Sequence, residues 1–166
     1  REVTHIELDE RMSRVATALQ KPDLDPGARV LVAMPNRFEF VEAFFGAMRG
    51  GFVPIPLNHK LGRKTIEFIL ADGCVQSAIV DPNCHQEILE IIEGSECRLN
   101  VTTQNSLSDW INYEEWLFSV EPSSLVPPEI KDDEIAFLPY TSGSTGLPKG
   151  VLLPHNGMLW AIKSAQ

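Results

Sequence analysis

Short apolar runs alternate with longer segments of helical periodicity along this chain, and no other feature constrains its fold as strongly. In residues 7–20, Leu8, Met12, Val15 and Leu19 recur at the spacing of an amphipathic helix. Residues 30–34 are a continuous apolar run, as in a strand covered on both faces. The same reasoning predicts further helices at 38–48, 66–70, 88–92, 113–120 and 158–162, and further strands at 52–57, 77–80, 99–102, 135–138 and 151–153. Strands alternating with helices predict an α/β fold, a mostly parallel sheet flanked by helices on both faces.

The composition is that of one globular domain, and it argues against several classes of function. The 166 residues are 43% hydrophobic and 22% charged, with a formal net charge of -9. This charge argues against a nucleic-acid partner, because a phosphate backbone is bound by a basic face. The sequence has no run of 18 apolar residues, so we expect no membrane span.

The number and spacing of the cysteines indicate the cellular compartment of the protein. The sequence has three, Cys74, Cys84 and Cys97. An odd number without a CxxC pair is not typical of a disulfide framework or a thiolate zinc site. We therefore expect no metal site built from these residues and a cytoplasmic location. The sequence begins at Arg1, within patterned sequence and without a signal peptide, so we expect an excised part of a longer protein.

Residues 140–150, YTSGSTGLPKG, carry the clearest chemistry. The segment combines three glycines, four serine or threonine hydroxyls and one lysine. Glycines let backbone N–H groups converge on one point, hydroxyls donate hydrogen bonds, and Lys149 adds a charge suited to phosphate. Neither the P-loop nor the GxGxxG pattern fits, because Gly150 follows the lysine and the glycine spacing differs. The segment predicts a polyphosphate clamp, with a hydrophilic hairpin joining two strands as the alternative.

The string YTSGSTGLPKGV at residues 140–151 resembles the phosphate-loop signature of the adenylate-forming, or AMP-binding, superfamily. That superfamily includes acyl-CoA synthetases, nonribosomal-peptide adenylation domains and firefly luciferase. Residues 4–11 resemble its opening strand and first helix, and residues 47–58, AMRGGFVPIPLN, resemble its Gly-Gly and Val-Pro segment. The similarity covers nearly the whole chain and is looser over residues 83–129. The resemblance implies that this chain is the N-terminal part of the large domain of an adenylate-forming enzyme.

The resemblance implies a two-step reaction that uses ATP, Mg²⁺ and coenzyme A. A carboxylate attacks the α-phosphate of ATP, giving an acyl-adenylate and pyrophosphate, and a thiol then displaces AMP. By the same resemblance, the residues that would hold the β- and γ-phosphates are Thr141, Ser142, Gly143, Ser144, Thr145, Gly146 and Lys149. No catalytic residue is assigned, because the family's later motifs for adenine, ribose and magnesium are missing from the sequence.

These missing motifs predict that residues 1–166 are a truncated N-terminal portion of an AMP-binding domain whose C-terminal remainder is absent. We expect the fragment to be inactive alone and its parent to be an ATP-dependent carboxylate–CoA ligase for a fatty or related acid. Leu57-Asn58 favours CoA as acceptor, since peptide-synthetase domains often carry Asp-Pro there. The alternatives are an adenylation domain that loads a peptide-synthetase or acyl-carrier protein, and a non-catalytic ATP-binding or structural module. A shortened domain would expose core surface, so a homo-oligomer is a further expectation.

The remaining candidates have plain structural explanations. His155 is expected at a helix start that is capped through Asn156, rather than in catalysis. Tyr140 is expected to pack its ring beneath the loop, and residues 131–134 are expected to form a solvated turn. The aromatic stripe within residues 38–48 is expected to pack against the sheet; it consists of Phe38, Phe44, Phe45 and Met48.

Overall fold

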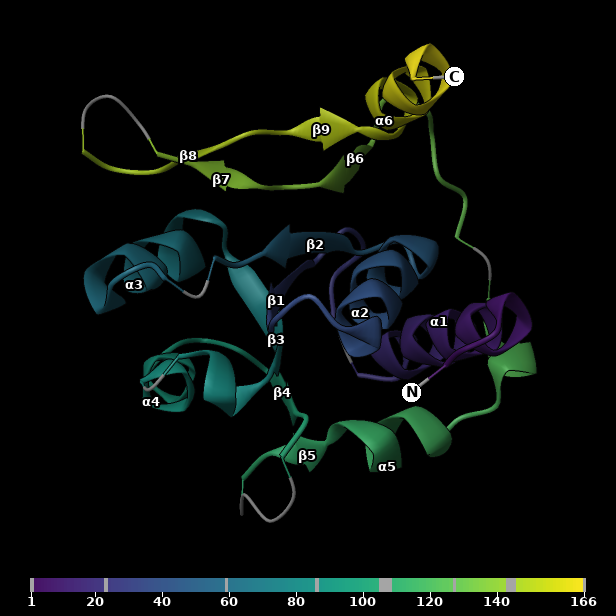
Figure 1. The fold of residues 1–166 in the computed structure, drawn as a ribbon, viewed down its shortest axis with the longest axis horizontal. Coiled ribbons are helices and arrows are strands. Elements are labelled where there is room, and N and C mark those ends of the chain that lie inside the picture. The colour runs from purple at the N-terminus through teal and green to yellow at the C-terminus, as the bar shows by residue number, and fades with distance from the viewer. Residues whose placement is uncertain are drawn as a thin grey trace.

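The structure is a computed structural model that describes residues 2–22, 24–58, 60–85, 87–104, 109–126, 128–142 and 146–165. A five-stranded parallel sheet with the strand order β2-β1-β3-β4-β5 forms its centre (Figure 1). The strands are β1 (Arg29–Ala33), β2 (Val53–Pro56), β3 (Val75–Val80), β4 (Leu99–Thr102) and β5 (Ile111–Asn112). The α-helices are α1 (His5–Gln20), α2 (Phe38–Arg49), α3 (Arg63–Asp72), α4 (Ile88–Glu93), α5 (Tyr113–Phe118) and α6 (His155–Ser164). The predicted α/β class is confirmed.

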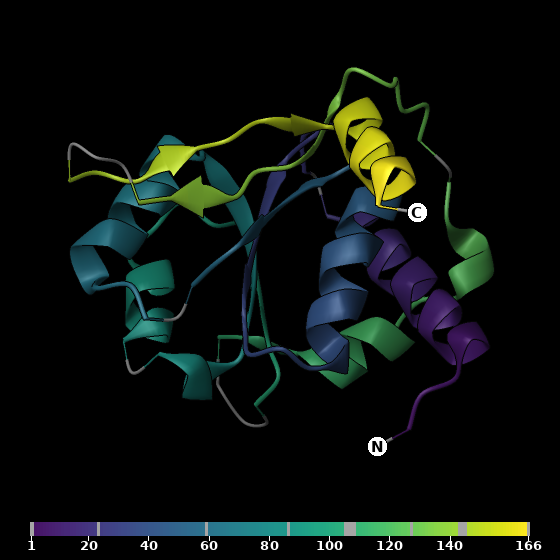
Figure 2. The ribbon, with the colours of Figure 1, turned by 45° about the horizontal axis from the view of Figure 1, so that its top comes forward.

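Helices cover both faces of the sheet, as the sequence predicts (Figures 1 and 2). Helices α1, α2 and α5 enclose one buried apolar cluster, and α3 and α4 enclose a second. Successive side chains of a strand point to opposite faces. In β1, Val30 and Val32 therefore join the first cluster, and Leu31 and Ala33 join the second. Because both faces of β1 are buried, residues 30–34 form a continuous apolar run.

The helix ends follow local sequence signals. Helix α1 begins after Thr4, whose side chain accepts a hydrogen bond from the backbone N–H of Glu7 at 3.2 Å. This contact satisfies one of the free N–H groups of the first turn. The C-cap residues of α2, α3 and α4 are Gly50, Gly73 and Gly94.

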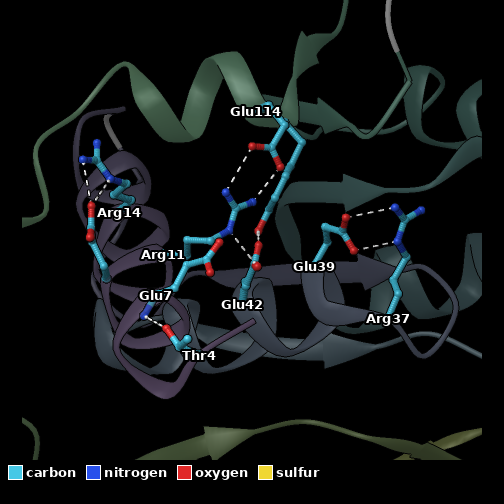
Figure 3. Close-up of polar contacts among 10 residues, drawn as sticks. Thr4, Glu7, Arg11, Arg14, Arg37, Glu39, Glu42 and Glu114 are labelled. Atoms are coloured by element: carbon cyan, nitrogen blue, oxygen red, sulfur yellow. Dashed lines mark hydrogen bonds and ion pairs between the residues drawn. The ribbon is translucent and has the colours of Figure 1, made fainter. Parts of the chain in front are cut away.

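A buried polar network joins α1, α2 and α5 (Figure 3). The Nε of Arg11 donates to Glu42 at 2.7 Å, and its two terminal nitrogens donate to the carboxylate of Glu114 at 3.1 and 2.6 Å. The Tyr113 hydroxyl donates to the other oxygen of Glu42 at 3.1 Å. Glu42 is completely buried. Burial and the neighbouring Glu42 carboxylate raise the pKa of Tyr113 well above its usual value.

The prediction that the aromatic stripe of α2 packs against the sheet is wrong in part. Helix α2 begins after the N-cap residue Arg37, and no side-chain hydrogen bond caps this end. Phe38 and Phe45 remain 39% and 40% exposed, whereas Met48 is buried as expected. The reason is that α2 turns a different face inward, the one that bears its small residues and Glu42; the buried residues of α2 are Glu42, Ala43, Gly46, Ala47 and Met48.

Residues 135–154 form two antiparallel strand pairs beside the parallel sheet. β6 (Ile135–Phe137) pairs with β9 (Leu153–Pro154), and β7 (Tyr140–Thr141) pairs with β8 (Lys149–Gly150). The strand predicted at 151–153 is thus wrong in extent, since residues 151 and 152 link β8 to β9. Pro139, which has no N–H to donate to a ladder, lies between β6 and β7.

Candidate functional site

The segment predicted to clamp a polyphosphate contains the β7–β8 hairpin. Tyr140 is paired with Gly150, and Thr141 is paired with Lys149, in antiparallel register. The Thr141 hydroxyl also donates to the Lys149 carbonyl at 3.5 Å. The hairpin lies over α3, beside the parallel sheet (Figures 1 and 2). The hairpin alternative is therefore correct about the local form.

Four of the seven predicted phosphate-binding residues lie within the described part of the chain. Thr141, Ser142, Gly146 and Lys149 are all exposed around one hairpin. The other three, Gly143, Ser144 and Thr145, lie outside the described residues. Gly146 has a φ of 95°, in the left-handed region that glycine adopts without steric cost. The structure therefore places these four residues on the two sides of one hairpin.

Lys149 is the cation of this hairpin. Its side chain makes no ion pair with any residue that the structure describes. An exposed ammonium group without a carboxylate partner is available to an external anion, and a compact charge of this kind suits phosphate. Lys149 precedes Gly150, which pairs with Tyr140 at the base of the hairpin. The backbone position of Lys149 is therefore set by that base.

The base of the hairpin is fixed by contacts to the parallel sheet and to α3. Leu138 is buried in the second apolar cluster, and its N–H donates to the Pro54 carbonyl of β2 at 3.1 Å. The Tyr140 hydroxyl donates to Oδ2 of Asp72, the last residue of α3, at 2.6 Å. The ring is half-buried against the same cluster, which confirms packing beneath the loop. The link to Asp72 was missed from sequence, because the two residues are 68 positions apart.

His155 begins α6, as the sequence predicts, but the capping differs. The N-cap is Pro154, and no side chain caps the helix, so capping through Asn156 is wrong. Instead, the backbone N–H groups of His155 and Asn156 donate to the carbonyls of Glu134 and Asp132, at 3.0 and 2.8 Å. The solvated turn predicted at 131–134 is present, and its backbone oxygens take the place of a capping side chain.

Among the described residues there is neither a cluster of three or more metal-ligating side chains nor a helix able to span a membrane. Nowhere among them do three or more His, Cys, Asp or Glu side chains gather in a group able to hold a metal ion. Within the same part of the chain, none of the helices combines the length and apolar character that crossing a bilayer requires.

The parallel sheet flanked by helices defines an α/β class of protein, and an exposed hairpin of glycine, hydroxyl and lysine residues lies beside that sheet. Comparison with known families makes the assignment specific. The family model described as "AMP-binding enzyme" matches residues 1–166, and the chain belongs to this family.

Known relatives support the family assignment. Feruloyl-CoA synthase from Amycolatopsis sp is 30% identical over 158 residues, which cover 95% of this chain and 29% of the relative. A medium-chain-fatty-acid–[acyl-carrier-protein] ligase, JamA, from Moorena producens is 30% identical over 168 residues, covering 95% of this chain and 26% of the relative. The crystal structure of a benzoate CoA ligase from Burkholderia xenovorans LB400 superposes with a TM-score of 0.83 at 25% identity, covering 97% and 31% of the two chains. The chain thus spans less than a third of the length of these relatives.

Proposed function

We propose that this chain supplies the ATP-phosphate-binding hairpin of an ATP-dependent carboxylate–CoA ligase. The observation that carries the proposal is the exposed hairpin of residues 140–150, with Lys149 free of ion pairs to the described residues, in a chain of the AMP-binding family. The similarity to feruloyl-CoA synthase and benzoate CoA ligase supports a carboxylic acid as substrate and CoA as acceptor. Residues 1–166 are, in this proposal, the N-terminal portion of a larger adenylation domain.

In the first proposed half-reaction, a carboxylate oxygen attacks the α-phosphorus of ATP. The bond from that phosphorus to the bridging oxygen breaks, and pyrophosphate leaves with the electron pair. The role of the hairpin is to hold the β- and γ-phosphates, with Thr141 and Ser142 donating hydrogen bonds and Lys149 offsetting negative charge. Gly143, Ser144, Thr145 and Gly146 complete the proposed set of phosphate-binding residues. Reactions of this type depend mainly on positioning and on neutralising charge that develops on the leaving group.

In the second half-reaction, a thiolate attacks the acyl carbonyl of the adenylate, and AMP leaves. CoA is the proposed acceptor, and Mg²⁺ is proposed to arrive with ATP as part of the substrate. A carrier-protein thiol is the second candidate acceptor, and the similarity to the acyl-carrier-protein ligase JamA favours it specifically. A fatty or related acid remains the proposed substrate class, while the similarity to feruloyl-CoA synthase and benzoate CoA ligase adds aromatic acids to the test.

The test uses the protein encoded by the complete reading frame that contains this chain. Purified protein is incubated with ATP, Mg²⁺ and a panel of medium-chain, long-chain and aromatic acids, and the nucleotide products are separated. The proposal predicts acid-dependent formation of AMP and pyrophosphate, followed by an acyl thioester when CoA is added. A thioester formed on a phosphopantetheinylated carrier protein but not on CoA would establish the second candidate acceptor. Release of ADP, or of AMP without dependence on any acid, would contradict the proposed function.

A further inference from the structure

One side chain connects the candidate phosphate-binding hairpin to the helical layer. The Tyr140 hydroxyl lies 2.6 Å from Oδ2 of Asp72, and Asp72 is the last residue of α3. Buried Ile66, Ile69 and Leu70 hold α3 in the second apolar cluster. The contact therefore ties an exposed hairpin to an element that is fixed by the core of the protein.

Asp72 is poorly placed for the stability of its own helix. The C-terminal end of a helix carries partial negative charge, which disfavours a carboxylate in the last turn. Helix α3 has no basic residue in that turn. The Tyr140 hydroxyl is the hydrogen-bond donor that the structure shows for the Asp72 side chain. The pKa of Tyr140 is raised by burial and by this carboxylate, so its hydroxyl keeps its proton and acts as the donor.

Two glycines leave the space in which the Tyr140 side chain lies. A Cβ atom on Gly73 would lie 3.3 Å from the Tyr140 hydroxyl and 2.9 Å from Ile55 Cδ1. A Cβ atom on Gly150 would lie 3.2 Å from Cζ of the Tyr140 ring. Gly150 is also the cross-strand partner of Tyr140 and the neighbour of Lys149. The ring thus packs directly on the strand that carries the lysine.

We propose that Tyr140 is a positioning residue, which holds the hairpin and its Lys149 at the end of α3 by donating its hydroxyl to Asp72. The inference rests on the proposed function for its kinetic consequence. When the hydrogen bond is lost, the hairpin samples more positions, and part of the binding energy for the ATP phosphates is used to order it again. The KM for ATP rises as a result, while the KM for the acid stays unchanged.

The kinetic test compares four variants in the complete protein. Tyr140→Phe and Asp72→Ala each remove the hydrogen bond, and we expect either to raise the KM for ATP about fivefold, the size typical of the net contribution of one ordinary hydrogen bond. Asp72→Asn retains an acceptor oxygen and is expected to restore most of the wild-type KM. The double variant is expected to be no worse than either single variant, because both remove the same contact.

Asp25→Ala is the matched control. Asp25 is exposed and accepts a hydrogen bond from Gln76 at 2.6 Å, the same length as the contact under test. It lies in the connection between α1 and β1, outside the hairpin. We expect this variant to leave the KM for ATP at the wild-type value.

Amide hydrogen exchange measures the positioning without any catalytic readout. In Tyr140→Phe, peptides covering residues 138–153 are expected to exchange about fivefold faster, with peptides covering β1 and β3 unchanged. Unchanged hairpin exchange together with an unchanged KM for ATP would overturn the positioning role. Equal acceleration of hairpin and core would also overturn it, since that pattern indicates global destabilisation. If the complete protein has no acid-dependent AMP-forming activity, the proposed function fails, while the exchange experiment still decides on the contact.

Discussion

At the residue scale, the buried network around Glu42 has the largest consequence for stability. Removing one partner of a buried ion pair leaves an uncompensated charge, which typically costs about 3–5 kcal/mol. We therefore expect Arg11→Ala to lower the free energy of unfolding by an amount in this range, measured by urea denaturation. Arg63 makes ion pairs with exposed Glu67 and Glu90, which solvent screens, so Arg63→Ala is expected to lower the free energy of unfolding far less than Arg11→Ala does. Similar losses for the two variants would show that burial of Glu42 does not matter.

The three cysteines are also predicted to differ in reactivity. Cys74 is exposed, whereas burial and the nearby Asp81 carboxylate raise the pKa of Cys84 to about 11. Burial also raises the pKa of Cys97. Only the thiolate is nucleophilic, so a raised pKa slows alkylation at neutral pH. With iodoacetamide at pH 8 we expect one rapidly modified thiol per chain, identified as Cys74 by mass spectrometry. Modification of Cys84 should accelerate as the pH rises toward 11, and equal rates for all three thiols at pH 8 would contradict this prediction.

At the element scale, the packing of α1 against α2 depends on a glycine. A Cβ atom on Gly46 would lie 2.6 Å from Cβ of Val15 and 2.9 Å from the Met12 carbonyl oxygen. In an unobstructed helix interior, Gly→Ala is stabilising by about 1 kcal/mol. At residue 46, we expect the clash of the added Cβ atom with Val15 and with the Met12 carbonyl to outweigh this gain. Gly46→Ala should therefore lower the free energy of unfolding by about 1–3 kcal/mol.

Gly157 of α6 is the control for this prediction. A Cβ atom there would make only ordinary contacts of 3.6 Å with Pro154. Gly157→Ala is therefore expected to be neutral or stabilising, by up to about 1 kcal/mol. Urea denaturation of the two variants should give changes of opposite sign. A stabilising Gly46→Ala would show that α1 and α2 do not pack as closely as described.

The elements also show what could be predicted from the sequence. The α-helices and strands β1 to β4 and β6 lie close to their predicted positions, because these follow from the spacing of apolar residues, whereas β5, β7 and β8 were not predicted. The hairpin was predicted only as an alternative, and the registers of β6–β9 and β7–β8 were not predicted, since they depend on where Leu138 meets β2 and on Pro139. The contact of Tyr140 with Asp72 spans 68 residues and that of Arg11 with Glu42 spans 31, so no local pattern encodes them. The exposure of the Phe38 and Phe45 side chains was not predicted, because the spacing of apolar residues does not reveal which side of a helix packs against the sheet.

At the scale of the whole molecule, one apolar surface remains uncovered on α6. Leu159, Trp160 and Ile162 are 51%, 72% and 50% exposed, and α6 has no buried residue among those described. Large exposed apolar patches are typical of interaction surfaces. We expect the isolated 166-residue chain to self-associate with rising concentration in sedimentation velocity experiments. Trp160→Glu should shift the distribution toward monomer, and a concentration-independent monomer for the unmodified chain would contradict this expectation.

The central claim for the whole molecule is that the hairpin carrying Lys149 binds the phosphates of ATP. The most direct test is the kcat/KM for ATP of Lys149→Ala in the complete protein, measured by acid-dependent pyrophosphate release. Loss of one charged group that stabilises a leaving group typically costs about 100-fold or more, and we predict a decrease of this size. Lys163→Ala, an exposed lysine in the last turn of α6, is the control and should retain wild-type activity. A Lys149→Ala enzyme with the wild-type kcat/KM for ATP would contradict the account.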